Sequence, residues 1–123
     1  MRSQVSSLSS DLKPEDVLAF VQTEIPNFSD IVDLDEGLYS ILGDLAIYLR
    51  DSINEGTASE LDLKAAFKVM NAMGASEDLE VQNLLVVGIF EILTDINVVT
   101  EIVRQRLEGK AAQLFNRVLI NCN

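Results

Sequence analysis

Three observations predict an all-α fold for this sequence. Apolar side chains recur every three or four residues along most of the chain, as on helices with one buried face. Serine, proline and glycine stand at intervals where helices begin and end. No stretch shows the alternation typical of a half-buried β-strand. We expect five or six helices, arranged as stacked helical hairpins of the armadillo/HEAT kind or as an orthogonal bundle.

The length and the N-terminal composition predict one domain. A chain of 123 residues with 48% hydrophobic side chains has room for a single core. Residues 1–12 are serine-rich and weakly patterned, so we expect a flexible arm there and a single helical domain over residues 13–123. Cys122 is the only cysteine, which excludes a disulfide within the chain and suits a reducing cytoplasm. No run of apolar residues is long enough to span a membrane.

The first helix is predicted between two prolines. Pro14 suits the first helical position, where its missing N–H costs nothing. Pro26 disfavours helical angles at the residue before it and so ends the helix near residue 24. We interpret residues 27–34 as a linker.

A second helix is predicted over residues 35–55. Asp35 and Glu36 would lie in its first turn, where negative charge favours the helix dipole. Gly56 follows at the position where a left-handed residue commonly ends a helix. Ile47 falls on the polar side of this helix, where an apolar residue is out of place.

The third helix is predicted to start at Ser59, in a Ser-x-x-Asp capping sequence, and to close at Met73-Gly74. Ser76 is expected to begin the fourth helix in the same way. That helix carries two apolar stripes, which predicts burial between neighbours at the centre of the fold. The two stripes are Val81, Leu84, Leu85, Gly88 and Ile92, and Leu79, Val86, Phe90 and Leu93. We expect Gly88 to contact a neighbouring helix.

The C-terminal segment leaves two possibilities open. A turn at residues 94–97 precedes helical patterns at 98–108 and 110–120. Gly109 between them either separates two helices or bends one.

The charge of the chain narrows the classes of partner. With 20 acidic and nine basic residues the net charge is −11, which disfavours nucleic acid and anionic membranes and favours a basic partner. The charge is unevenly distributed. Residues 1–103 contain 19 acidic and five basic side chains, whereas residues 104–123 contain one acidic and four basic side chains.

The residue types required for most catalysis are missing. The chain contains no histidine, the commonest general base and metal ligand, which excludes Ser-His-Asp and Cys-His constellations. The acidic run at Asp33, Asp35 and Glu36 does not fit a calcium-binding loop, because Leu38 occupies the position that requires glycine. We therefore expect no catalytic residue, no cofactor and no bound metal.

The stretch from Ser76 to Leu93, SEDLEVQNLLVVGIFEIL, together with Gly43 to Leu49 upstream, resembles small acidic all-helical proteins of bacteria. Some of those proteins resemble immunity proteins of polymorphic toxin systems. The resemblance extends over about residues 15–105 and implies a helical fold and an immunity role. Its motifs are hydrophobic and capping patterns, so it assigns no binding residue.

These observations lead to two hypotheses about function. The first is a non-enzymatic cytoplasmic module that binds another, basic protein and acts as an immunity protein or inhibitor. The second is a structural or regulatory homo-oligomer, with Ile47 and the basic C-terminal face in the interface. The predicted partner-binding residues of the first hypothesis are Asp30, Asp33, Asp35, Glu36, Asp44, Ile47, Tyr48 and Asp51.

Overall fold

The computed structural model describes residues 12–29, 33 and 35–122. Most of these residues are helical and none forms a β-strand, which confirms the predicted all-α fold. The predicted arm lies outside the described residues except for Leu12, which packs against the core. The helical elements are α2 (Pro14–Glu24), α3 (Pro26–Ser29), α4 (Leu38–Glu55), α5 (Glu60–Ala75), α6 (Leu79–Leu85), η1 (Val86–Phe90), α7 (Glu91–Leu93), α8 (Asn97–Arg106) and α9 (Gly109–Cys122).

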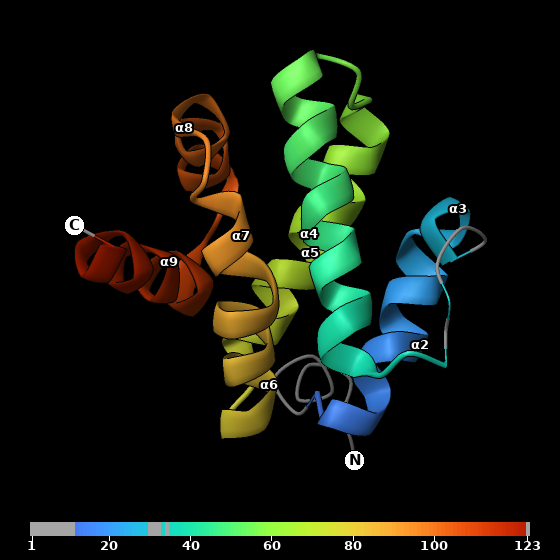
Figure 1. Cartoon of the computed structure of the whole chain (residues 1–123). Helices are drawn as coiled ribbons and strands as arrows, with labels where there is room; N and C mark the ends of the chain where they lie inside the picture. Colours follow the sequence, from blue (N-terminus) through green and yellow to red (C-terminus); the bar gives the residue numbers. More distant parts are fainter. Residues whose placement is uncertain (1–11, 30–32, 34, 123) are drawn as a thin grey trace.

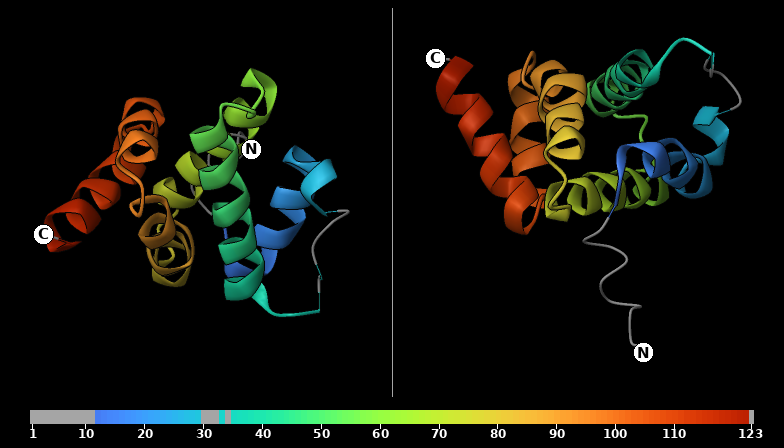
Figure 2. Two further views of the ribbon diagram at one scale, coloured as in Figure 1. Left: turned by 45° about the horizontal axis from the view of Figure 1, so that its top comes forward. Right: turned by 90° about the horizontal axis from the view of Figure 1, so that it is seen from below.

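The helices form a bundle around one central helix, which consists of α6, η1 and α7 in sequence (Figure 1). α4 packs against η1 and α7, while α5 packs against α6, and α9 against η1. α5 also contacts α2 and α9. Figure 2 shows α9 and the α2–α3 pair at opposite edges of the bundle. The central position predicted for the fourth helix is therefore confirmed.

The central helix contains one turn of π-helix, η1, which the sequence analysis did not predict. A π-turn holds an additional residue, so the residues before and after it no longer follow one continuous stripe. Phe90 and Leu93 are fully buried, whereas Val86 is half-buried and Leu79 is 77% exposed. The prediction that the second stripe is buried along the whole helix is therefore wrong at its N-terminal end.

Gly88 and Gly74 lie where helices cross. A Cβ atom placed on Gly88 would meet the Leu42 Cβ atom of α4 at 3.5 Å, which confirms the predicted contact with a neighbouring helix. Gly74 was expected to close the third helix, and this prediction is wrong. α5 continues to Ala75, and Gly74 is buried within it because α9 crosses there. A Cβ atom on Gly74 would lie 2.6 Å from the Ala111 Cα atom.

Three predicted helix ends are confirmed. Pro14 is the first residue of α2. Gly56 follows α4 in the left-handed conformation, with φ of 74°, which only glycine adopts without strain. The Ser59 hydroxyl oxygen accepts a hydrogen bond of 3.1 Å from the Asp62 N–H and so caps α5.

Two predicted helix starts are corrected. α4 begins at Leu38, because Gly37 has a φ of 96° that does not fit a helix, so Asp35 and Glu36 precede the helix and do not lie in its first turn. Ser76 follows α5 and does not cap α6. The cap of α6 is Asp78, whose carboxylate accepts hydrogen bonds from the N–H groups of Glu80 and Val81. The Ser76 hydroxyl instead donates a 2.6 Å hydrogen bond to the Leu12 carbonyl oxygen.

The remaining connections differ in part from the predictions. Ile25 leaves the helical conformation before Pro26, as expected, but residues 26–29 form the short helix α3 and are not an open linker. This turn directs the Phe28 side chain into the core. At the C-terminus, Leu107 has extended backbone angles and Gly109 has a φ of 56°, so α8 and α9 are separate helices.

Candidate interaction face on helix α4

Seven of the eight predicted partner-binding residues lie in the described part of the chain, and Asp30 lies outside it. We call these seven the acidic face of α4. Six are exposed and Asp51 is half-buried. The residues of the acidic face are Asp33, Asp35, Glu36, Asp44, Ile47, Tyr48 and Asp51.

Two segments bring the carboxylates of this face together. Asp35 donates its backbone N–H to the Asp33 carboxylate at 2.9 Å, which shapes the turn before α4. This turn sets Glu36 beside Asp44, which lies one and a half turns into the helix. The hydrogen bond between the two carboxyl groups raises the pKa of Glu36 above its ordinary value, and the charges of Asp44 and Asp33 act in the same direction.

Asp33, Glu36 and Asp44 form no ion pair with a basic side chain in the described part of the chain. A cation placed between them would replace a repulsion with two attractions. The arrangement therefore favours the binding of a lysine or arginine side chain from outside the described structure.

Apolar side chains continue this face along α4. Ile47 lies one turn after Asp44 and is 41% exposed, and Tyr48 beside it is 38% exposed. The Tyr48 ring contacts the Phe28 ring of α3, with centroids 6.2 Å apart, so one edge of the tyrosine is held against the fold. The face thus combines acidic side chains with exposed apolar surface, and aromatic residues such as tyrosine are enriched in protein interfaces.

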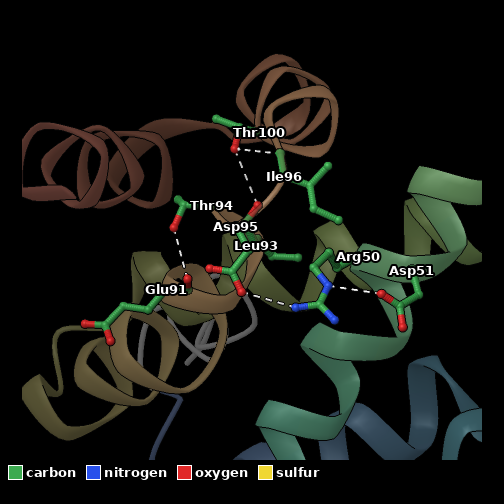
Figure 3. Close-up of polar contacts among 8 residues, drawn as sticks. All are labelled: Arg50, Asp51, Glu91, Leu93, Thr94, Asp95, Ile96 and Thr100. Carbon is green, nitrogen blue, oxygen red and sulfur yellow. Dashed lines mark hydrogen bonds and ion pairs between the residues drawn. The ribbon is translucent and has the colours of Figure 1, made fainter. Parts of the chain in front are cut away.

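Asp51 differs from the other acids of the face. Its carboxylate pairs with the Arg50 Nε atom at 3.0 Å, and the Arg50 Nη1 atom pairs with Asp95 at 3.2 Å (Figure 3). Arg50 thereby joins α4 to the turn between α7 and α8, which is further tied by the Thr100 hydroxyl donating to the Ile96 carbonyl oxygen. The charge of Asp51 is therefore partly neutralised within the chain. The sequence did not reveal the pairing of Arg50 with Asp95, because these two residues are 45 positions apart.

Of the eight basic side chains in the described part of the chain, four form ion pairs, and three of these four lie away from α4. Arg106 forms two hydrogen bonds with the Glu60 carboxylate, at 2.8 and 3.0 Å, and these lower the pKa of Glu60. Lys68 pairs with Glu24 and Arg104 with Glu101. No group of three or more potential metal ligands occurs within residues 12–29, 33 and 35–122.

The chain is thus a small all-helical domain in which the acidic face of α4 exposes both carboxylates and apolar side chains. The chain belongs to the DUF7674 family, a domain of unknown function, whose family model matches residues 18–121. Comparisons with curated proteins and with solved structures found no match. None of the described helices combines the length and the apolarity needed to cross a membrane.

Proposed function

We propose that this chain is a non-enzymatic module that binds a basic protein through the acidic face of α4. The observation that supports the proposal most strongly is the grouping of Asp33, Glu36 and Asp44, without a basic partner among the described residues, beside the exposed side chain of Ile47. Long-range attraction by such a face accelerates the encounter with a cationic surface, and apolar contacts then slow dissociation.

The roles within the face follow from its geometry. A partner lysine or arginine is held between Glu36 and Asp44, where its charge compensates the two neighbouring carboxyl groups whose hydrogen bond raises the pKa of Glu36. Ile47 is the apolar anchor, because it is exposed one turn further along the helix. Asp51 contributes less than the sequence pattern suggests, since Arg50 already neutralises part of its charge.

We further propose an inhibitory role of the immunity kind, in which the partner is a basic toxin or effector. The resemblance of residues 76–93 to small acidic helical proteins of bacteria, some of which resemble immunity proteins, and the net charge of −11 support this finer proposal. A neighbouring gene that encodes a toxin would favour it, and one that encodes a metabolic or transcription protein would contradict it. The alternative function, a regulatory homo-oligomer, is favoured by a different surface, on α6 and α9.

The proposal is tested by affinity capture from the source cells with matched baits. Asp44→Lys reverses a charge on the acidic face, whereas Glu91→Lys makes the same change at an exposed residue of α7 that points away from Arg50 (Figure 3). Both variants change the net charge from −11 to −9. We expect wild type and Glu91→Lys to retain the same basic protein and Asp44→Lys to lose most of it. Equal retention by all three baits would contradict the proposal.

Ile47→Ala separates binding from packing. If Ile47 is the apolar anchor, the variant dissociates faster from the captured protein and keeps the melting temperature of the wild type. A lower melting temperature with unchanged dissociation would show instead that Ile47 packs within the chain.

A further inference from the structure

A second surface carries features that the acidic face of α4 does not explain. α6, η1 and α9 enclose a shallow hollow of about 470 Å³, which we call the α6–α9 groove. Leu79 stands at its edge and is 77% exposed, in contrast to the burial that the sequence pattern predicts for it. The residues that line the groove are Leu79, Glu80, Gln82, Asn83, Val86 and Leu114.

The two walls of this groove carry opposite charges. On the α6 side, Glu80 lines the groove and is exposed, and Glu77, two residues before α6 begins, is exposed as well. On the α9 wall, Lys110 and Arg117 are exposed one turn before and one turn after Leu114, so they share its side of the helix. α9 contains these two basic residues and no acidic residue, which is unusual in a chain with a net charge of −11.

Opposite charges on either side of a hollow that contains Leu79, Val86 and Leu114 make the surface self-complementary. When two copies meet about a twofold axis, the acidic wall of each copy faces the basic wall of the other. The protruding Leu79 of each copy then enters the hollow beside Val86 and Leu114 of its partner copy. Burial of the Leu79 side chain in the interface removes its apolar surface from water and so favours the dimer.

A different protein would match this surface less well. An acidic helix would attract Lys110 and Arg117 but would place its negative charges against Glu80. A basic helix would attract Glu80 but would place its positive charges against Lys110 and Arg117. A second copy satisfies both walls at once.

We propose that the α6–α9 groove is a twofold interface between two copies of this chain. Ile47, which the sequence analysis placed in an oligomer interface, lies on α4 and outside this groove, so the proposal does not depend on the binding role of α4.

The first test is the mass of the full chain in solution, measured by sedimentation equilibrium over concentrations up to about the millimolar range. We expect a dimer of twice 13.6 kDa, with a dissociation constant that rises as salt is added. Leu79→Lys should raise that dissociation constant at least about tenfold. The matched control is Leu61→Lys, because Leu61 on α5 is 78% exposed and lies outside the groove, and it should leave the mass unchanged.

The second test reverses the charges of the walls. Lys110→Glu with Arg117→Glu makes both walls acidic and should abolish the dimer. Adding Glu77→Lys and Glu80→Lys exchanges the walls, keeps them complementary and should restore it. Circular dichroism confirms that each variant folds. A chain that stays monomeric throughout, a dimer that survives Leu79→Lys, or a wall exchange that fails to restore the dimer would each overturn the proposal.

Discussion

The two helix crossings that contain glycine differ in how closely the neighbouring helix approaches. At the crossing of α5 and α9, a Cβ atom on Gly74 would lie within 2.6–2.7 Å of the Ala111 backbone. At the crossing of α4 and η1, a Cβ atom on Gly43 would meet only the Ile92 Cδ1 atom at 3.6 Å and the Gly88 carbonyl oxygen at 4.0 Å. The first crossing is therefore fixed by backbone contact, whereas the second is filled by side chains and has space to spare.

This difference predicts which substitutions should change stability and which should change the proposed binding. α9 makes the closer of the two glycine crossings, with α5, and it also joins η1 through the edge-to-face pair of Phe90 and Phe115, whose centroids are 4.9 Å apart. α4 rests against the central helix with ordinary contacts and presents its outer, acidic face to solvent. We therefore expect substitutions at the first crossing to change the free energy of unfolding, and substitutions on the acidic face to change binding.

The largest effect is expected from Phe90→Ala. Phe90 is fully buried in the π-turn and joins the central helix to α9 through Phe115. Removal of the ring leaves a cavity and should lower the free energy of unfolding by about 3–5 kcal/mol, a large part of the total for a domain of this size. Urea denaturation followed by circular dichroism measures it. A loss below about 1 kcal/mol would show that the crossing can collapse around the missing ring.

Gly74→Ala should have the next largest effect. The added methyl group cannot be accommodated without separating α5 from α9, because the atoms it meets belong to the Ala111 backbone. We expect a loss of about 1–3 kcal/mol in the same measurement, even though alanine favours helices over glycine. An unchanged or raised stability would contradict the close approach.

Gly43→Ala is the matched control at the other crossing. The methyl group meets the flexible end of Ile92 at an ordinary contact distance, so little has to move. The gain in helix propensity should then leave the protein as stable as the wild type, or more stable by up to about 1 kcal/mol. A loss as large as that of Gly74→Ala would remove the distinction between the two crossings.

The smallest effect concerns the titration of Glu36. Its pKa is raised above the ordinary 4.5 in the folded chain, so the folded state keeps this proton longer than the unfolded state as the pH rises. Glu36 therefore makes the free energy of unfolding fall with rising pH, in a window that begins near 4.5 and ends above the folded pKa. Carboxyl carbon NMR should show the raised pKa in the wild type and a lower one in Asp44→Asn. An identical pKa in both chains would mean that Asp44 is not the cause.

Local signals allowed much of the fold to be predicted from the sequence. Pro14, Gly56 and Ser59 act through their own backbone and side-chain chemistry, which does not depend on distant residues. The periodicity of α4 placed its core residues inside and left Asp44 and Ile47 outside, so the exposure of the candidate face was predictable.

Long-range packing accounts for what the sequence did not predict. Gly74 has the residue type of a helix terminator, and only the approach of α9 explains a glycine inside the helix. The π-turn interrupts the apolar stripe that begins at Leu79, and no residue type in the sequence predicts such a turn. The pairing of Arg50 with Asp95 joins α4 to the turn between α7 and α8 and is visible only after folding.

The most direct test of the binding role is the association rate constant for the captured partner, measured at increasing salt concentration with wild type and Asp44→Lys. Exposed charges are screened beyond about 8–10 Å near physiological ionic strength, so the wild-type rate should fall steeply as salt is added. Asp44→Lys should associate more slowly at low salt, show a weaker salt dependence and approach the wild-type rate at high salt. Rates that are equal for the two chains and independent of salt would contradict docking through the acidic face of α4.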